Sequence, residues 1–151
     1  MVERLSDRTL GTLASGIARP RYDRASVRAG IVHLGIGAFH RAHQAVYIDD
    51  CLAAGESDWG IVGASLRSSA TRHALAPQDG LYTLNVRSSD SESLRVIGSV
   101  VGLAVAPEDP SGLVATLSNP AIRLVTLTVS EKAYLRDAAG DLDATHAAVR
   151  A

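Results

Sequence analysis

The run GIGAFHR over residues 35–41 has the residue types and spacing of a loop that binds a diphosphate. It directly follows an apolar run and directly precedes a helical pattern, which is the context that a dinucleotide-binding turn requires. Gly35 permits a tight exit from the strand, and Gly37 lets a diphosphate approach the backbone without meeting a Cβ atom. The N–H groups at the positive end of the helix, from about Phe39 onward, would then hold the anion.

His40 and Arg41 lie in the first turn of that helix. A cation there opposes the helix dipole, so a nearby phosphate is a sensible compensating partner. The general fingerprint has a third glycine, and this sequence has histidine at that position. Two glycines alone are also consistent with a purely structural turn, but the strand and the helix on either side favour nucleotide binding.

A dinucleotide site also needs a group for the adenosine ribose at the end of the second strand, about 20 residues further on. The sequence there is SLRSSA over residues 65–70, without a carboxylate. Arg67, with Ser68 and Ser69, could accommodate a 2′-phosphate or stack on the adenine, and a solvated arginine is the alternative. The choice between NAD and NADP therefore stays open.

Polar residues also follow the last apolar run, in the sequence TLTVSEKAY over residues 126–134. In an open parallel sheet, ligands bind beyond the carboxyl ends of the strands. Thr128, Ser130 and Glu131 are thus placed to face the nicotinamide side of a cofactor or the substrate entrance. Lys132 is a candidate proton carrier, and an ion pair with Glu131 is the alternative.

Other polar residues have simpler structural interpretations. His40 and His43 are three residues apart, but two histidines without a third ligand are usually packing or surface residues, so we expect no metal. We expect His33 to be a hydrogen-bonded core histidine and Cys51 a small buried residue. The pair at residues 49–50, both aspartates, is interpreted as solvated.

A predicted alternation of strands and helices positions these residues. Apolar runs without polar alternation are typical of buried strands in a parallel sheet. Asp109 and Pro110 have the types favoured at an N-cap and at the first helical position. The predicted strands are 30–35, 59–66 and 121–129, the predicted hairpin strands are 81–87 and 93–100, and the predicted helices are 1–18, 40–54 and 110–117. Residues 19–29 are interpreted as a solvated arm, 68–80 as a short helix or irregular piece, and 130–151 as a loop with a helix starting at 146–150.

The composition is that of a soluble globular protein, with 151 residues, of which 46% are apolar and 21% charged. A net charge of −1 argues against a nucleic-acid partner, because phosphate neutralisation needs an excess of positive charge. No window reaches the ~20 apolar residues of a membrane helix, and the N-terminus lacks a secretory signal. The single cysteine excludes an intrachain disulfide and indicates a reducing compartment, so we expect a cytoplasmic protein.

Five runs of the sequence resemble the mannitol dehydrogenase family, which comprises polyol-specific long-chain dehydrogenases and reductases such as mannitol 2-dehydrogenase and fructuronate reductase. The runs are IVHLGIGAFHRAHQAVYIDD (31–50), DWGIVGASLR (58–67), LYTL (81–84), RVIGSV (95–100) and LTVSEKAY (127–134). The resemblance implies a Rossmann domain that binds NAD(P), with residues 35–41 as the pyrophosphate turn. It also implies hydride transfer between the nicotinamide and a polyol, ketose or sugar-acid substrate.

In this family the catalytic lysine, asparagine and histidine lie in a mostly helical C-terminal domain. The resemblance therefore implies no catalytic residue in these 151 residues, none at Lys132, and an inactive chain when it is alone. Some relatives have an acid shortly after the Leu-Arg pair that helps to select NAD, and this chain has Ala70 there. The Glu131-Lys132 pair is a little more similar to the fructuronate reductase branch.

We therefore predict an α/β fold, with a Rossmann-type, mostly parallel sheet, an inserted β-hairpin and an incomplete C-terminal end. Residues 1–29 would be an N-terminal helix and arm, and 30–151 a truncated dinucleotide-binding domain. The predicted function is the cofactor domain of an oxidoreductase, with NAD as cofactor and NADP as the alternative; a non-catalytic nucleotide-binding fragment or module is the alternative function. An exposed sheet edge predicts self-association. The residues assigned to the cofactor are Gly35, Ile36, Gly37, Ala38, Phe39, His40, Arg41, Arg67, Ser68, Thr128 and Glu131.

Overall fold

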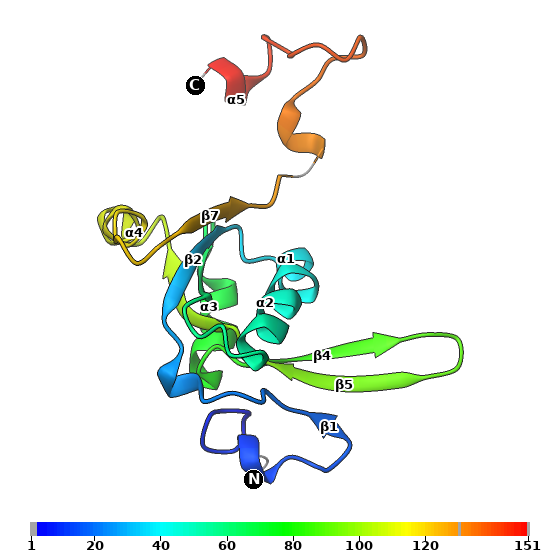
Figure 1. Ribbon diagram of the computed structural model, residues 1–151. Coiled ribbons are helices and arrows are strands. Elements are labelled where there is room, and N and C mark those ends of the chain that lie inside the picture. Colours follow the sequence, from blue (N-terminus) through cyan, green and yellow to red (C-terminus); the bar gives the residue numbers. More distant parts are fainter. Residues whose placement is uncertain (1–2, 130, 151) are drawn as a thin grey trace.

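The main sheet of the protein is parallel and four-stranded. The computed structural model describes residues 3–129 and 131–150. In the order β6-β3-β2-β7, each strand of the sheet runs parallel to its neighbours (Figure 1). The strands are β2 (Ala29–Leu34), β3 (Gly60–Ser65), β6 (Val100–Val105) and β7 (Leu124–Leu127). The parallel pairing confirms the predicted Rossmann-type α/β fold.

Helices cover both faces of this sheet. Ile31 of β2 is buried with Ala45 of the helix α2 (Gln44–Ala53), which follows the short helix α1 (Ala38–Ala42). The next residue, Val32, is buried on the opposite face with Leu113 of α4 (Pro110–Leu117). Successive side chains of a strand point to opposite faces, so the uninterrupted apolar run in β2 serves both layers. Asp109 caps α4 as predicted, because its carboxylate accepts from the N–H of Gly112 at 2.8 Å.

The predicted β-hairpin is also present. It consists of β4 (Tyr82–Arg87) and β5 (Glu92–Ile97), which pair in antiparallel fashion. The two-residue strand β1 (Ile17–Ala18) pairs parallel to β5, which gives a second sheet in the order β1-β5-β4. In Figure 1 the hairpin projects from the body of the molecule, with β1 beside it.

Several predicted elements are wrong or displaced. The predicted helix over 1–18 is replaced by the 3-10 turn η1 (Leu10–Thr12) and by β1. The predicted helix over 40–54 begins earlier and breaks at His43 into α1 and α2. Strand β6 was not predicted, because only the two residues 98–99 separate it from the hairpin strand β5.

Strand β7 is an exposed edge, and its prediction as a buried strand is wrong. Its only neighbour among the described residues is β2, and Leu124, Val125 and Leu127 are between 42% and 60% exposed. Unpaired backbone groups beside apolar side chains are a template for pairing with another chain. Self-association through this edge stays a prediction.

The remaining elements are short. The helix α3 (Ala70–Leu75) and the 3-10 turn η3 (Ala76–Gln78) follow β3, and Leu75 is buried with Val100 of β6. After β7, the 3-10 turn η4 (Glu131–Tyr134) and the helix α5 (Ala147–Arg150) lie in a segment that extends away from the sheet in Figure 1. Among the described residues, every helix is too short or too polar to span a membrane.

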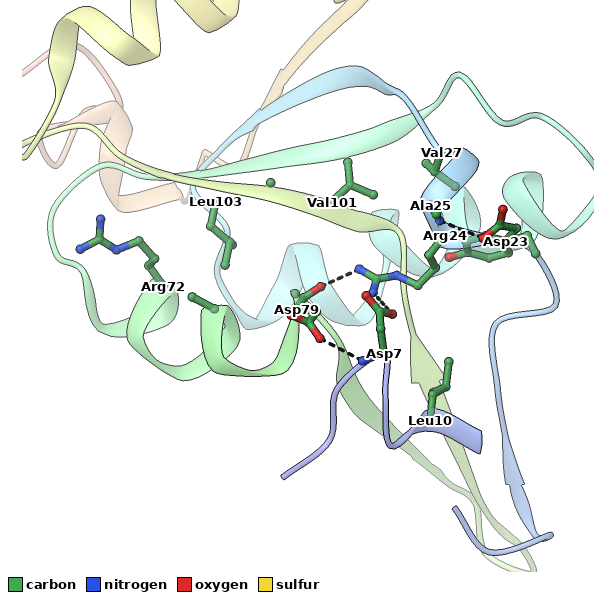
Figure 2. Close-up of a pocket in the computed structure, with 14 residues that line it drawn as sticks. Asp7, Leu10, Asp23, Arg24, Ala25, Val27, Arg72, Asp79, Val101 and Leu103 are labelled. Carbon is green, nitrogen blue, oxygen red and sulfur yellow. Dashed lines mark hydrogen bonds and ion pairs between the residues drawn. The ribbon is translucent and has the colours of Figure 1, made fainter. Parts of the chain in front are cut away.

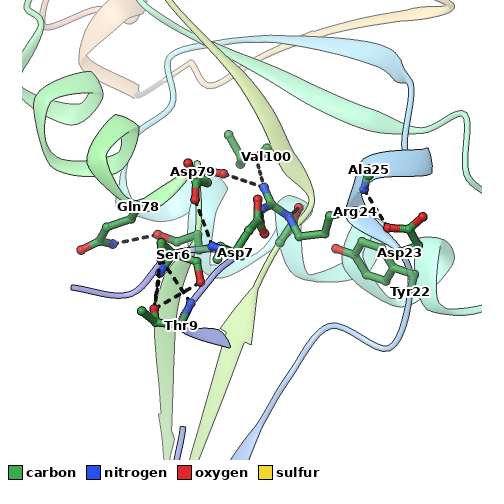
Figure 3. A network of polar contacts seen from close by, with 12 residues as sticks. Ser6, Asp7, Thr9, Tyr22, Asp23, Arg24, Ala25, Gln78, Asp79 and Val100 are labelled. Carbon is green, nitrogen blue, oxygen red and sulfur yellow. Dashed lines mark hydrogen bonds and ion pairs between the residues drawn. The ribbon is translucent and has the colours of Figure 1, made fainter. Parts of the chain in front are cut away.

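The N-terminal arm is held to the body of the protein by an arginine whose side chain is 10% exposed. Arg24 begins the 3-10 turn η2 (Arg24–Ser26), and its guanidinium donates to the carbonyl oxygens of Gly98 at 3.0 Å, Asp79 at 2.6 Å and Val100 at 3.2 Å. It also pairs with the carboxylate of Asp7, as Figure 3 shows. The interpretation of residues 19–29 as a solvated arm is therefore wrong at this position.

A second buried contact ties the same arm to α2. Asp49 is 1% exposed and accepts from the Tyr22 hydroxyl at 2.5 Å, the Arg95 guanidinium at 2.6 Å and the Gly98 N–H at 2.8 Å. Burial raises the pKa of Tyr22, so its hydroxyl stays a donor. Asp49 is thus a structural carboxylate and was wrongly interpreted as solvated, whereas Cys51, expected to be buried, is exposed.

Candidate functional site

The backbone of the turn between β2 and α1 is folded back onto β3. Gly35 has φ of 99°, which glycine adopts without the strain that a side chain would bring. The N–H groups of Gly35 and Ile36 both donate to the carbonyl oxygen of Ala64, at 2.8 and 3.3 Å. The N–H of Gly37 donates to the carbonyl oxygen of Gly35 at 2.6 Å. These three N–H groups are therefore already used inside the turn.

Side-chain contacts also hold the same turn in place. Ile36 is only 3% exposed, and its side chain fills the space over Gly63, where an added Cβ would lie 2.0 Å from Ile36 Cδ1. The Arg41 guanidinium donates to the Ile36 carbonyl oxygen at 2.8 Å, and the Tyr82 hydroxyl donates to the Arg41 carbonyl oxygen at 2.6 Å. The turn is thus held by contacts with β3, α1 and β4.

The free donors of the turn lie just after its glycines. Within the described part of the chain, no acceptor is bonded to the N–H groups of Ala38, Phe39 and His40. A Cβ added at Gly37 would meet no atom closer than the Gly35 carbonyl oxygen at 3.8 Å, so the space in front of Gly37 is open. Three free N–H groups beside an open glycine are the arrangement that a diphosphate needs.

His40 does not provide a charge to this turn. It is 1% exposed and stacks on His33, with ring centroids 3.6 Å apart. Burial, reinforced by His33, lowers the pKa of His40 from 6.5 to about 4, so the ring is neutral at pH 7. The interpretation of His40 as a cation in the first turn is therefore wrong. The main-chain N–H of His40, not its ring, is the group that remains open to an anion.

The two buried histidines belong to a chain of hydrogen-bonded polar side chains, of which only His33 was predicted. His33 Nδ1 lies 2.8 Å from Thr126 Oγ1, and His33 Nε2 lies 3.1 Å from Thr128 Oγ1. The Thr126 hydroxyl donates to Gln44 Oε1 at 3.2 Å, and His40 Nδ1 lies 3.1 Å from the same oxygen. The expectation of a hydrogen-bonded core histidine at position 33 is confirmed.

The other predicted site residues lie around the edge at which the parallel strands end, here called the carboxyl edge. Phe39 is 66% exposed and stacks on His43. Arg67 and Ser68 are exposed directly after β3. Thr128 is exposed beside the turn, with its Cβ 3.9 Å from where a Gly35 Cβ would be. Glu131 begins η4, but its side chain and the whole of Ser130 lie outside the described residues.

Two cavities lie away from the carboxyl edge. One of about 820 Å³, shown in Figure 2, is lined by Arg24, Asp79 and Leu103 among others, and the N-terminal segment with Asp7 forms one of its walls. The second, of about 550 Å³, is lined by Asp49, Arg95 and residues of the arm. None of the predicted cofactor residues lines either cavity.

The buried histidine pair predicts a loss of stability in acid. The pKa of His40 is lower in the folded chain than its ordinary 6.5, and burial also lowers the pKa of His33. The unfolded chain therefore binds more protons, and stability falls from about pH 6.5 to about pH 4, by roughly 3 kcal/mol for His40. We expect His40→Gln to remove most of this acid-dependent part in urea unfolding followed by Trp59 fluorescence. The exposed His73→Gln is the control, and parallel pH profiles for wild type and His40→Gln would contradict the expectation.

Comparison with known proteins identifies the family. The model of the mannitol dehydrogenase Rossmann domain matches residues 29–148. Mannitol 2-dehydrogenase of Cereibacter sphaeroides is 44% identical over 137 residues, which are 89% of this chain and 29% of that protein. Mannitol 2-dehydrogenase of Pyrenophora tritici-repentis is 40% identical over 134 residues, which are 87% of this chain and 24% of that protein. The chain thus spans less than a third of the length of these relatives.

Solved structures give the same result. The mannitol 2-dehydrogenase of Pseudomonas fluorescens, solved as a ternary complex with NAD and D-mannitol, superposes with a TM-score of 0.84 at 40% identity, over 94% of this chain and 30% of that one. A substrate-free D-sorbitol dehydrogenase superposes with a TM-score of 0.82 at 35% identity, over 97% of this chain and 31% of that one. The resemblance found in the sequence is confirmed: this chain belongs to the mannitol dehydrogenase family, as its Rossmann domain.

Proposed function

We propose that this chain binds NAD along the carboxyl edge of its main sheet, as the cofactor domain of a mannitol 2-dehydrogenase type of oxidoreductase. The observation that supports this most is the set of three free N–H groups, at Ala38, Phe39 and His40, beside the open face of Gly37. They fit the two negative charges of a diphosphate, and the turn is fixed before any ligand arrives. The residues proposed for the diphosphate are those at 35–41.

The two ends of the cofactor would lie on either side of this turn. Exposed Arg67 and Ser68 at the end of β3 are proposed for the adenosine ribose. Thr128 at the end of β7, and Glu131, are proposed for the nicotinamide half. When bound, the nicotinamide exchanges a hydride with the substrate. The residues of this chain hold and orient the cofactor, and none of them is proposed as catalytic.

The proposed substrate of the whole enzyme is a polyol. The relatives named above are mannitol 2-dehydrogenases and a D-sorbitol dehydrogenase, and one of them was solved with D-mannitol. A sugar acid is the alternative, and it rests only on the pair Glu131-Lys132. The single cysteine of the chain supports a reducing compartment, so we propose the cytoplasm as the location.

Replacing Gly37 separates a binding turn from a structural one. Gly37 has φ of −79°, which any residue adopts, and an added Cβ would make only an ordinary van der Waals contact with the Gly35 carbonyl oxygen at 3.8 Å. We therefore expect Gly37→Ala to keep the wild-type melting temperature but to bind NADH at least tenfold more weakly in a fluorescence titration. Gly16→Ala, whose added Cβ meets no atom within 4 Å, is the matched control. Unchanged NADH affinity in Gly37→Ala would show that the turn is only structural.

In this proposal, Arg67 determines how strongly the chain binds NADPH, which carries a 2′-phosphate, relative to NADH. No carboxylate stands in the sequence SLRSSA after β3, so nothing there repels a 2′-phosphate, and an arginine can pair with it. We expect Arg67→Ala to weaken NADPH binding about tenfold and NADH binding much less, measured by calorimetry. Exposed Arg28 at the opposite end of the sheet gives the control Arg28→Ala. Equal losses for both cofactors would instead place Arg67 on the adenine.

A further inference from the structure

The chain of hydrogen-bonded side chains behind the candidate site has a defined direction. Gln44 Oε1 can only accept, so the Thr126 hydroxyl uses its single hydrogen to donate to it at 3.2 Å. Thr126 Oγ1 must then accept from His33 Nδ1, which lies 2.8 Å away. A neutral His33 with its proton on Nδ1 has a lone pair on Nε2. The Thr128 hydroxyl, 3.1 Å from Nε2, therefore donates inward to His33.

His40 supports this direction over the reverse one. Its Nδ1 lies 3.1 Å from Gln44 Oε1 and donates to it, which leaves a bare lone pair on His40 Nε2. This Nε2 is buried and has no partner among the described residues. In the reverse direction, with the Gln44 amide turned over, Nδ1 would accept and Nε2 would be a buried N–H without an acceptor. A buried donor without a partner is rarer than an acceptor in the same position, so the first direction is favoured.

Thr128 lies at the carboxyl edge, and the direction of its hydroxyl hydrogen is fixed by His33. It directly follows β7, its N–H donates to the Leu34 carbonyl oxygen at 3.2 Å, and it lies beside Gly35. Its single hydrogen is engaged by His33, so only oxygen lone pairs face the solvent. Such an oxygen can accept a hydrogen bond from a ligand but cannot donate one. It would favour a ligand hydroxyl or amide N–H and disfavour a carboxylate or phosphate oxygen.

We propose that His33 fixes Thr128 as an acceptor, so that Thr128 selects a hydrogen-bond donor on the nicotinamide half of the cofactor. This rests on the proposed function, and it makes Thr128 a specificity-determining residue and His33 the positioning residue behind it. The donor is an N–H of the carboxamide group or a hydroxyl of the nicotinamide ribose. Thr126, Gln44 and His40 complete the chain that sets the direction.

The first test needs no ligand. Nitrogen chemical shifts of the imidazoles, measured by NMR on the whole chain at pH 7, report which nitrogen of His33 has the proton. We expect the proton on Nδ1, and we expect Thr128→Val to shift the Nε2 resonance while the tautomer stays the same. A proton on Nε2 overturns the inference, whatever the chain binds.

The second test measures ligand selection with NADH, its reduced 3-acetylpyridine analogue, which lacks the amide N–H, and ADP, which lacks the nicotinamide half. We expect Thr128→Val to bind NADH about fivefold more weakly, which corresponds to one hydrogen bond of ~1 kcal/mol. Thr128→Ser should restore the affinity, and ADP binding should not change. Thr83→Val, at an exposed position on β4, is the control.

The analogue distinguishes the two donors. If Thr128 accepts from the carboxamide, the wild type prefers NADH over the analogue and Thr128→Val loses that preference. If it accepts from a ribose hydroxyl, Thr128→Val weakens both ligands equally. Wild-type affinity of Thr128→Val for NADH and for the analogue overturns the inference while leaving the proposed function intact. Failure of the wild type to bind NADH and ADP contradicts the proposed function itself, and the tautomer measurement then still decides the direction of the chain.

Discussion

The candidate site depends on one carbonyl group, that of Ala64 at the end of β3. It accepts from the N–H groups of both Gly35 and Ile36, which pulls the chain back toward β3 as it leaves β2. Only a residue that tolerates a φ of 99° can make this bend, and that residue is Gly35. The bend uses the N–H groups before residue 38 and leaves the following ones open. One backbone contact thus determines which donors a ligand can reach.

The second constraint is how α1 packs on β2 without the third glycine of the general fingerprint. That glycine normally allows the helix to approach the strand closely. Here His40 occupies the position and lies flat on His33, with ring centroids 3.6 Å apart and 12° between the ring planes. Two flat neutral rings thus replace the close backbone contact. His33 also lies within hydrogen-bond distance of Thr126 on β7 and of Thr128 directly after β7, so the packing solution connects both sides of the site.

The sequence was informative where the signal is local. The apolar run of β2, the glycines of the turn and the Asp109 cap each depend on neighbours within a few residues, and all three were predicted. Arg24 and Asp49 were misinterpreted because their partners are distant, as in the contact between Asp49 and Gly98. Gln44 was missed as a site residue, although its spacing of four from His40 places both on one side of a helical segment.

The sequence does not show which main-chain N–H groups of the turn are free. The glycines mark the turn, but hydrogen bonds within the fold decide which N–H groups are free, and a sequence does not display those. The predicted burial of β7 failed for a related reason. Its apolar pattern is that of a strand covered on both faces, and among the described residues it has β2 as its only neighbour.

The central claim is that the main-chain N–H groups of Ala38, Phe39 and His40 hold the diphosphate. Amide proton and nitrogen shifts, followed by NMR while ADP or NADH is added, test it most directly. The account predicts large downfield shifts for these three amides and small ones for Gly35 and Ile36, which are already bonded to Ala64. Saturable binding that leaves the amides of residues 38–40 unchanged would contradict it.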